Sequence, residues 1–582
     1  MKEESQVEIK RHSLAHLLAY AVLTKYPNAK LAIGPSVDNG FYYDIDFGDA
    51  KLTDADLKGL EKQMSHFIKQ NLKFERSEMP IAEALKLAEV ESNPYKTEII
   101  SDLQKAGETV VSFYKVGNFT DLCRGPHVES TRDIKEGSFK INRLAGAYWR
   151  GDEKNKMLTR VYGLAFDNKL ELDEYLNLMA EAEKRDHRKL GKELNLFMNH
   201  EFAPGMPFFL PKGMIMVQEL IKFVREYSYG VGYREVRTPQ IFNSELWKIS
   251  GHWEHYQEDM FCMHHDEDDV DLGLKPMNCP AHMLVFKRDL HSYKELPLRL
   301  AETTTLYRNE KSGTLHGLTR VRSLSQDDTH IFLRPDQVLS EISDLLQKIK
   351  NIYKVFDLQI DEIHLSTRPE KFLGERSVWD QAEDNLKTAL TAANLEYKIN
   401  EGDGAFYGPK IDVKIKDAIG RQWQLATIQL DFQLPLRFEL TYTDSDGSAK
   451  TPVVIHRALL GSIERFFGIV IEHYAGAFPL WLSPVQVKLI SVAETHIAYC
   501  KQLEEELRGH GIRVEIDDTD STVGNKIRKA VNEKSPYMLV IGDKEVAAPT
   551  LSVRARGEQE AKEFAKDAFI KQLLEEIKTM GK

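Results

Sequence analysis

The central part of the chain, residues 196–483, contains many short runs in which apolar and polar residues alternate, with few regular helix–strand repeats between them. Such alternation gives a strand one apolar face for a core and one polar face. The pattern favours an antiparallel sheet with helices over a doubly wound parallel sheet. Because the chain has 582 residues, it is too long for one core and is expected to form several domains.

The segments on either side of this region have different patterns. Residues 1–168 combine a helical start with strands punctuated by glycine and proline, which predicts an α+β domain. Residues 169–195 place apolar residues at helical spacing among many charges, as in a solvated linker helix. Residues 484–582 alternate strands and helices, which predicts a small α/β domain. The fold class is therefore expected to be α+β and multidomain.

Composition excludes several other classes of protein. The chain has only 4 cysteines and a formal net charge of -12. These numbers argue against a disulfide framework and against broad nonspecific binding of nucleic acid, while a local RNA-binding face stays open. The sequence contains no apolar run of the ~20 residues that a membrane span needs, and its first residues lack a signal-peptide pattern. We expect a cytoplasmic protein.

Two stretches of the central region concentrate polar residues on predicted strands. In LYRNEKSG, Arg308 and Glu310 are two residues apart and would share one strand face. In SLSQDDTHIF, the same spacing relates Gln326, Asp328 and His330. Taken alone, a pair such as Arg308 and Glu310 also fits an ion pair on the surface.

A third stretch, further along the chain, extends this set. In QLATIQLDF, Thr427 and Gln429 share a face, and Gln424 could join them only through a β-bulge.

In PVVIHRALLGSIERFFG, Arg457, Gly461 and Arg465 would lie on one helical face if the segment is helical throughout. The neighbouring His456 alone fits a packed core histidine as well as a ligand.

The stretch KPMNCPAHMLVF raises a question about metal binding, because Cys279 and His282 are separated by two residues. Two ligands on one short segment cannot supply the three protein ligands of an open zinc site. The spacing leaves open whether the pair is local or whether one residue belongs to a site assembled from elsewhere.

Together and in this order, the stretches resemble class II aminoacyl-tRNA synthetases. YREVRTPQIF with Pro239 is similar to the first class motif, YRNE with Arg308 to the second, and GSIERF with Glu464 and Arg465 to the third. MNCPAH, SGTLHGL, QDDTHIF, GDGAFYGPKID, TIQLDF and IHRALLGSIERF further resemble the threonyl-tRNA synthetases, and the resemblance extends from the first domain to the C-terminus. It implies a homodimeric ligase that joins L-threonine to tRNA(Thr) through a threonyl-adenylate made with ATP.

The resemblance also implies roles for residues of this chain. It places Arg308 on the α-phosphate of ATP, Arg465 near the adenine and γ-phosphate, and Glu310 on the adenine edge, with Mg²⁺ sharing the stabilisation of charge. His252 matches a position near the terminal ribose of the tRNA. The implied ATP-binding set is Arg308, Glu310, Leu324, Gln429 and Arg465, and the implied catalytic set is Arg308, Arg465, Lys410 and His252.

By the same resemblance, Cys279, His330 and His456 hold one zinc ion, which leaves positions open for the amino and hydroxyl groups of threonine. The implied substrate-binding residues are Asp328, which would hold the ammonium group, Gln326, Tyr407 and Thr427. Valine lacks the hydroxyl and can be rejected strongly, whereas serine lacks only a methyl group, a difference of roughly 1–3 kcal/mol. A second, hydrolytic site for serine is therefore expected.

The N-terminal region offers residues for such a site. RHSLAHLL places His12 and His16 on one helical face, and TDLCRGPHV contains Asp121, Cys123 and His127, a set that could hold a second zinc ion. The region resembles the editing domain shared by threonyl- and alanyl-tRNA synthetases, and in the threonyl branch these residues position a hydrolytic water without metal. The site expected to hydrolyse Ser-tRNA(Thr) consists of His12, His16, Lys96, Asp121, Cys123 and His127, and whether it binds zinc is open. The chain is expected to lack the ubiquitin-like domain that precedes this region in most bacterial members.

The last domain resembles the anticodon-binding module of class IIa synthetases, with Glu545 and Arg554 at positions that read anticodon bases. The sequence departs from the family in VRSLSQDD, where Leu324 replaces a phenylalanine that stacks on adenine, so weaker ATP binding is expected. It departs again at Ala281, where glycine is usual, and the acidic stretch 264–271 is expected to be a solvated loop. The alternatives to a ligase are a catalytically weak paralogue that binds tRNA or mRNA, and a trans-editing hydrolase.

Overall fold

The computed structural model describes residues 5–230, 232–266, 270–548 and 550–580. The chain divides into two compact units, Met1–Ala180 and Glu181–Lys582. Helix α5 (Lys169–Arg185) spans the boundary between them. Among the described residues, no helix is both long and apolar enough to cross a membrane.

The first unit has two antiparallel sheets, one in the order β1-β3-β8-β7 with β2 added on β3, and one in the order β4-β5-β6. Helix α1 begins with a capping box between Ser5 and Glu8 and packs its buried residues against the first sheet. The strands are β1 (Lys30–Leu31), β2 (Ser36–Val37), β3 (Gly40–Asp46), β4 (Phe74–Pro80), β5 (Val110–Val116), β6 (Phe119–Leu122), β7 (Phe139–Tyr148) and β8 (Met157–Ala165), and the helices are α1 (Gln6–Lys25), α2 (Asp54–Lys69), α3 (Ile81–Val90) and α4 (Pro94–Lys105).

The second unit is built on an eight-stranded sheet in the order β11-β16-β19-β26-β23-β22-β20-β21. Neighbouring strands are antiparallel except at the two edges, where β11 pairs with β16 and β20 with β21 in parallel. The predicted antiparallel sheet is therefore confirmed. Its strands are β11 (Tyr233–Glu235), β16 (Leu298–Glu302), β19 (Asp328–Leu333), β20 (Gln359–Ser366), β21 (Lys398–Asn400), β22 (Lys410–Lys416), β23 (Gln422–Asp431) and β26 (Val453–Ala458).

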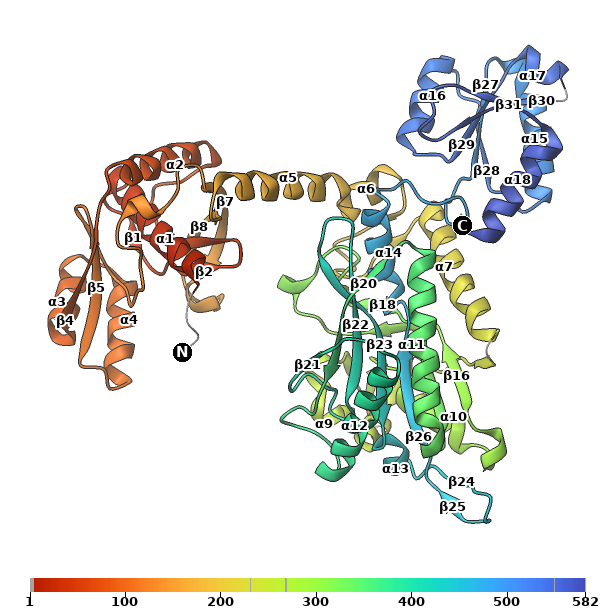
Figure 1. Ribbon diagram of the computed structural model, residues 1–582, viewed down its shortest axis with the longest axis horizontal. Helices are drawn as coiled ribbons and strands as arrows, with labels where there is room; N and C mark the ends of the chain where they lie inside the picture. The colour runs from red at the N-terminus through yellow and green to blue at the C-terminus, as the bar shows by residue number, and fades with distance from the viewer. Residues whose placement is uncertain (1–4, 231, 267–269, 549, 581–582) are drawn as a thin grey trace. The chain divides into compact units, whose positions relative to one another are not determined.

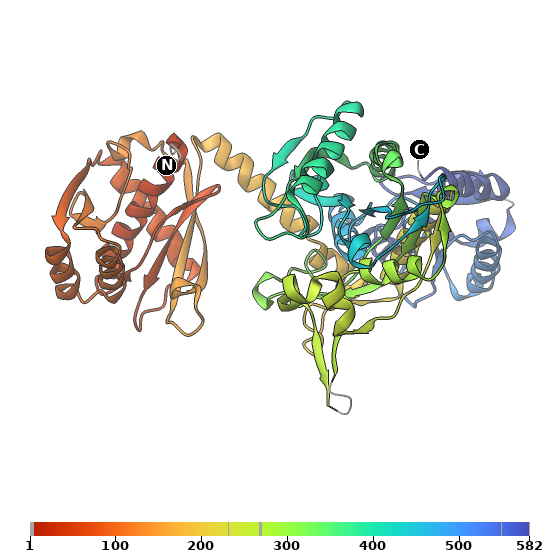
Figure 2. The same ribbon diagram turned by 90° about the horizontal axis from the view of Figure 1, so that it is seen from below.

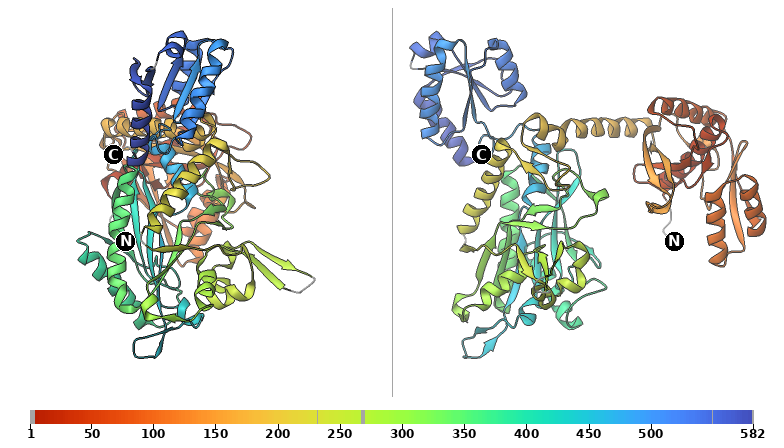
Figure 3. Two further views of the ribbon diagram at one scale, coloured as in Figure 1. Left: turned by 90° about the vertical axis from the view of Figure 1, so that its right-hand side faces the viewer. Right: turned by 180° about the vertical axis from the view of Figure 1, so that it is seen from behind.

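Helices cover one face of this sheet and close the largest core of the chain. Helix α11 lies along the sheet (Figures 1 and 3) and buries Ile342, Leu345, Ile349 and Ile352, which recur at intervals of three or four residues. The covering helices are α7 (Pro211–Tyr229), α11 (Val338–Val355), α12 (Arg376–Ala392) and α14 (Ile463–His473).

The other face of the sheet is polar in its middle. Along β19, Ile331 and Leu333 enter the helix-covered core, whereas Asp328 and His330, at the alternate positions, line a cavity. The same alternation repeats on β26 and β23. The sheet therefore gathers polar side chains from strands that are distant in the sequence.

Two local expectations for the sequence need correction. The single linker helix expected over residues 169–195 is two helices, α5 and α6 (His187–Glu193), because the Asp186 side chain caps the second helix at its Arg188 N–H. The stretch 264–271 is not a simple loop: β13 (Cys262–His265) and β14 (Val270–Leu274) pair as a projecting hairpin (Figure 2). Residues 267–269 lie outside the described residues.

Smaller elements surround the central sheet. They are β9 (Phe197–Met198), β10 (Phe208–Phe209), β12 (Ile241–Asn243), β15 (His291–Ser292), β17 (Thr305–Tyr307), β18 (Ser323–Ser325), β24 (Tyr442–Thr443), β25 (Ala449–Lys450), α8 (Ser244–Ser250), α9 (His252–His255), α10 (Cys279–Lys287) and α13 (Leu434–Arg437).

The C-terminal part of the second unit has its own sheet and core. The sheet order is β28-β27-β29-β30-β31, with parallel pairing around β27 and antiparallel pairing beyond β29, and the predicted α/β arrangement is present. Its elements are β27 (Val487–Ser491), β28 (Val514–Asp517), β29 (Tyr537–Ile541), β30 (Thr550–Ala555), β31 (Lys562–Ala565), α15 (Ile497–Gly509), α16 (Val523–Asn532), α17 (Asp543–Ala547) and α18 (Lys566–Thr579).

Candidate active sites

The second unit has a cavity of about 340 Å³ on the polar face of the eight-stranded sheet. Ten residues predicted from the sequence line it: Cys279, Arg308, Gln326, Asp328, His330, Tyr407, Lys410, Thr427, Gln429 and His456. Four other predicted residues, Glu310, Leu324, Arg465 and His252, lie outside this lining. The sheet thus brings together most of the predicted set.

Three of the lining side chains form a compact group of metal-ligating type. His330 and His456 are direct partners on β19 and β26, and Nε2 of His330 lies 3.0 Å from Nδ1 of His456. Cys279 is the first residue of α10, and its Sγ and the two histidine nitrogens lie within 4.8 Å of one another. His282, one turn further along α10, contacts the opposite side of the His330 ring. Cys279 and His282 are therefore not a local ligand pair.

The hydrogen bonds of His456 determine which of its nitrogens carries the proton. Its Nε2 lies 2.9 Å from Oδ2 of Asp431, whose Oδ1 accepts the backbone N–H groups of Gln433 and Leu434. An ionised carboxylate only accepts hydrogen bonds, so Nε2 is protonated and Nδ1 presents a lone pair. Burial raises the pKa of the Cys279 thiol well above its usual value, so its thiolate needs a cation nearby. This donor set, with a carboxylate behind a histidine, fits zinc.

Asp328 lies beside this group. It shares a face of β19 with His330, as predicted; its Oδ1 is 3.9 Å from Nδ1 of His330, and Asn278 donates to its Oδ2 at 3.0 Å. Gln326 lines the same cavity but precedes the strand, where it forms an isolated bridge with Ser462.

The polar face of β23 includes the bulge that Gln424 was expected to need. The pairing of β22 with β23 shifts just after Asp412. As a result, Gln424 and Thr427 both donate to Oδ1 of Asp412, at 2.6 and 3.0 Å. Gln429 faces the same cavity as Thr427, as predicted.

Lys410 and Tyr407 complete this wall of the cavity. Lys410 pairs with Asp412 at 2.9 Å and with Asp403 at 3.3 Å. Burial lowers the pKa of Lys410, but the two carboxylates outweigh it, so the pKa is raised and the ammonium group stays charged. The ring of Tyr407 lies 5.1 Å from that of His456.

Arg308 and Glu310 do not share a strand face, which corrects the prediction. Strand β17 ends at Tyr307, and the backbone N–H of Arg308 bonds to the carbonyl of Arg322 in a loop. Nε of Arg308 is buried and has no hydrogen-bond partner among the described residues. The Glu310 carboxylate accepts from Arg320 at 2.9 Å.

Arg457, Gly461 and Arg465 are not on one helical face either. Arg457 belongs to β26, and Gly461 has a φ of +74°, a left-handed conformation that ends any regular structure there. Helix α14 begins only afterwards, capped by the Ser462 hydroxyl, which accepts from the Arg465 N–H at 3.1 Å.

Arg465 lies close to other positive charges. Burial, followed by the charges of Arg308 and Arg320, lowers the pKa of its guanidinium, and Glu310 raises it. Its Nε donates to the carbonyl of Thr319 at 3.0 Å. Three arginines with one nearby carboxylate form an environment suited to a phosphate anion.

Leu324 and His252 are buried and lie outside the lining of the cavity. Leu324 packs with Leu306 and Val321 in a small apolar cluster. His252 bonds to the Ser250 hydroxyl at 2.9 Å, and its Nε2 lies 3.8 Å from Sγ of Cys279. Burial lowers the pKa of His252 to about 3, so this imidazole is neutral.

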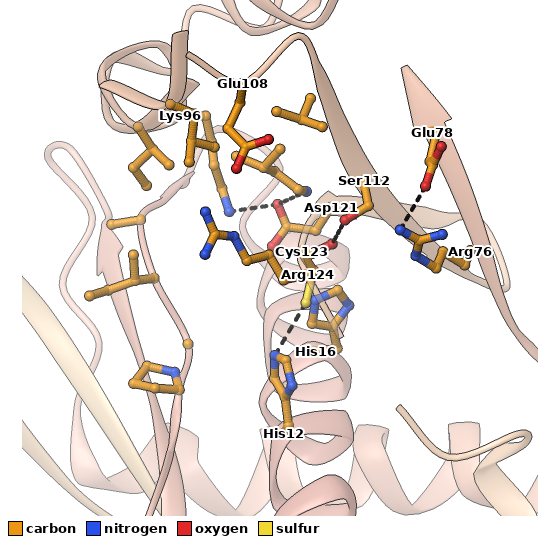
Figure 4. A pocket seen from close by; sticks show the side chains of 18 of the residues that line it. His12, His16, Arg76, Glu78, Lys96, Glu108, Ser112, Asp121, Cys123 and Arg124 are labelled. Carbon is orange, nitrogen blue, oxygen red and sulfur yellow. Dashed lines mark hydrogen bonds and ion pairs between the residues drawn. The ribbon is translucent and has the colours of Figure 1, made fainter. Parts of the chain in front are cut away.

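The first unit has a larger cavity, of about 770 Å³, lined by five of the six predicted hydrolytic residues: His12, His16, Lys96, Asp121 and Cys123. The Cys123 sulfur lies 3.2 Å from Nε2 of His12 (Figure 4) and 3.2 Å from Nε2 of His127. His127 is anchored through Nδ1 to Ser13 at 3.1 Å. Burial lowers the pKa of both His16 and His127, so these imidazoles are neutral.

A buried ion pair forms the opposite wall of this cavity. Lys96 lies 2.7 Å from Asp121 (Figure 4), and the Tyr43 hydroxyl donates to the same carboxylate. Lys96 also lies 3.3 Å from the Tyr43 oxygen. The cavity thus places a Lys96–Asp121 ion pair, with the neutral Tyr43 bonded to it, near a Cys–His cluster. Tyr43 was missed from the sequence because no spacing links it to the others.

In the C-terminal part, Glu545 and Arg554 are half-buried and make local contacts. Glu545 accepts from the Gly542 N–H at 3.0 Å in the first turn of α17, and Arg554 on β30 donates to the carbonyl of Glu558 at 2.8 Å.

Sequence reasoning also missed Asp431, Asp412 and Asn278, which hold His456, Thr427 and Asp328. For Asp431 a signal was available, because it lies two residues after Gln429 on the same strand face.

Three family models match the chain. They are the tRNA synthetase class II core domain (G, H, P, S and T) over residues 260–474, the anticodon binding domain over residues 486–576, and the threonyl and alanyl tRNA synthetase second additional domain over residues 111–162.

Curated relatives match almost the whole chain. The threonine–tRNA ligases of Clostridium acetobutylicum and Clostridioides difficile are each 51% identical over 568 and 572 residues, which is 98% of this chain and 88% of each relative. Among solved structures, the RNA binding domain of threonyl-tRNA synthetase from Cryptosporidium parvum is 42% identical, with a TM-score of 0.65, and the match covers 68% of this chain and 98% of that one.

Proposed function

The chain belongs to the threonyl-tRNA synthetase family, and from this premise we propose that it joins L-threonine to tRNA(Thr) with ATP in the second unit and hydrolyses Ser-tRNA(Thr) in the first. The 51% identity over 98% of the chain supports both activities together. The observation that carries the assignment of the synthetic site is the convergence of Cys279, His330 and His456 beside Asp328. A silent paralogue is disfavoured, because ten of the predicted residues line one cavity, among them Arg308 and all three proposed zinc ligands.

The proposed zinc site consists of Cys279, His330 and His456. A bound zinc would supply Lewis acidity and open positions for the amino and hydroxyl groups of threonine. Asp328, held by Asn278, binds the ammonium group, and Asp431 keeps Nδ1 of His456 unprotonated. The discrimination against valine follows from the hydroxyl that valine lacks.

The proposed ATP site lies where the loop after β17 approaches α14. Arg308, with its unpartnered buried Nε, binds the α-phosphate, and Arg465 stabilises the γ-phosphate. Glu310 contacts the adenine edge, Leu324 supports the adenine pocket from the buried side, and Gln429 contributes from the sheet. Mg²⁺ accompanies the ATP.

The remaining residues of the cavity position the reactants. Lys410, kept charged by Asp412 and Asp403, stabilises negative charge that develops during adenylate formation. Gln326, Tyr407 and Thr427 line the threonine side. His252, whose Nε2 lies 3.8 Å from Sγ of Cys279, acts on the terminal ribose of the tRNA.

The proposed editing site uses His12, His16, Cys123 and His127 to hold a water against the seryl ester. Lys96 and Asp121 orient the ester and its ribose from the opposite wall. Hydrolysis in a separate cavity is physically needed, because serine retains the hydroxyl and differs from threonine by roughly 1–3 kcal/mol.

We assign residues 1–168 to the editing domain, 169–195 to the linker, 196–483 to the catalytic domain and 484–582 to the anticodon-binding domain. In the last, Glu545 and Arg554 contact anticodon bases. The active form is a homodimer joined partly through the segment around Pro239.

Threonine-dependent exchange between ATP and pyrophosphate tests the synthetic activity. The zinc-loaded protein is expected to catalyse exchange, and chelation is expected to abolish it. A folded, zinc-loaded sample without exchange would refute the proposal.

A further inference from the structure

A buried chain of hydrogen bonds lies behind His330, on the side away from the cavity. Nδ1 of His330 is 2.8 Å from Nδ1 of His282, and Nε2 of His282 is 3.0 Å from Oε2 of Glu302. All three side chains are almost fully buried. Since His282 and Cys279 are one turn apart on α10, one helix supplies both a ligand and a group that contacts the next ligand.

The groups around Glu302 determine the direction of this chain. The carboxylate accepts from the Thr238 N–H at 2.8 Å, from Nζ of Lys275 at 3.0 Å and from the Thr304 hydroxyl at 3.2 Å. Surrounded by donors and paired with a lysine, it is ionised and can only accept. His282 must therefore donate through Nε2.

The contact between the two imidazoles then needs one proton. With Nε2 of His282 directed at Glu302, which also pairs with Lys275 at 3.0 Å, Nδ1 of His282 is the atom that meets Nδ1 of His330. When Nδ1–H of His330 donates in this contact, Nε2 of His330 keeps a lone pair that is directed into the cavity toward His456.

We infer that Glu302 and His282 are positioning residues, which fix the tautomer and ring orientation of His330 so that its Nε2 is free to bind a metal ion. The inference rests on the proposed zinc-dependent recognition of threonine. It explains the spacing of Cys279 and His282 without making His282 a ligand. It also gives a role to the buried Lys275, which holds Glu302 ionised.

Glu302→Gln is the sharpest test, because it preserves the size of the side chain and reverses the direction of the hydrogen bonds from residue 302 to His330. The glutamine oxygen would face Lys275 and Thr238, leaving its NH₂ group to donate to Nε2 of His282. His282 would then donate from Nδ1, and His330 would carry its proton on Nε2, where it blocks coordination. Zinc affinity should fall about 10- to 100-fold, the usual effect of losing a partner behind a metal ligand.

Two variants of His282 separate positioning from packing. His282→Leu removes the acceptor and should weaken zinc binding by a similar factor, whereas His282→Asn keeps an acceptor near the Nδ1 position and should restore part of the affinity. The matched control is Glu341→Gln, which removes a buried carboxylate that pairs with Arg299 on the same strand as Glu302.

The measurements are zinc competition titrations and the visible spectrum of the cobalt-substituted full chain, with KM for threonine and ATP determined separately. We expect weaker metal binding, an altered cobalt spectrum and a higher KM for threonine in Glu302→Gln and His282→Leu, with KM for ATP unchanged. Wild-type zinc affinity in folded Glu302→Gln and His282→Leu would overturn the inference, as would an equal loss in Glu341→Gln. A wild-type chain that binds no zinc would instead overturn the proposed function.

Discussion

The two cavities contain similar donors but satisfy them differently. In the second unit, Nε2 of His456 donates a hydrogen bond to Asp431, and Nδ1 of His330 donates one to His282. The lone pairs of His456 Nδ1 and His330 Nε2 therefore face each other 3.0 Å apart. In the first unit, His12 and His127 both face the Cys123 sulfur, at 3.2 Å each. There the thiol can donate to one imidazole and accept from the other.

This difference predicts that the two clusters of histidine and cysteine differ in their need for a metal ion. A metal ion can bind the two lone pairs of the His330–His456 pair, whereas neutral hydrogen bonds can satisfy the Cys123 cluster. Carboxylates behind the ligands distinguish the two cases, as expected for zinc sites with an ordered outer shell. The comparison predicts a metal-dependent synthetic site and a metal-independent editing site.

The largest effect is expected from Cys279→Ala. Loss of the thiolate should remove metal-assisted binding worth several kcal/mol, so threonine-dependent exchange should fall by on the order of 10³-fold or more. Hydrolysis of Ser-tRNA(Thr) should stay unchanged. Cys500→Ala is the matched control, since Cys500 is equally buried but lies in the C-terminal core. Exchange at the wild-type rate in Cys279→Ala would show that the synthetic activity does not depend on a metal ion held by Cys279.

Chelation tests the comparison without mutation. Stripping zinc from the wild-type chain should abolish exchange, and deacylation of Ser-tRNA(Thr) in the same sample should continue at its original rate. Re-adding zinc should restore exchange. A parallel loss of deacylation, reversed by zinc, would show that the Cys123 cluster is also a metal site.

The sequence predicts the parts of the synthetic site that alternate along a strand. Asp328 with His330, and Thr427 with Gln429, follow from parity alone, because side chains two apart lie on one strand face. The arginine loop does not follow from such a rule: β17 ends at Tyr307, so Arg308 and Glu310 lie beyond the strand, where parity no longer applies.

The helix expected through Gly461 is absent for a local reason. Glu302 and His282 were missed because they meet only in the tertiary structure. Gly461 takes a left-handed φ, so the strand and α14 are separate elements. Glu302 and His282 meet only after β16 and α10 have packed, and no spacing in the sequence connects them. Tertiary packing is therefore needed to distinguish a ligand from its support.

Lys96→Met should impair deacylation and spare exchange, which is the opposite of the effect expected for Cys279→Ala. Without its ammonium group, the buried Asp121 loses the partner 2.7 Å away, and the ester is no longer oriented. Deacylation of Ser-tRNA(Thr) should fall by about 10²-fold, the low end for loss of a positioned acid–base group, while exchange with threonine stays unchanged. The outcome contrary to this assignment is normal deacylation by a folded Lys96→Met chain.

The smallest effect is expected at Leu324. This side chain is buried with Leu306 and Val321, so a phenylalanine must displace neighbours before its ring can reach the adenine. Overpacking of a core costs about 1–3 kcal/mol, which competes with a stacking gain of about 1–3 kcal/mol per base. Leu324→Phe should therefore lower KM for ATP only a few-fold and leave KM for threonine unchanged. The substitution is expected to act on the ATP side of the cavity. A change in KM for threonine alone would therefore show that the two substrate pockets are coupled through the sheet.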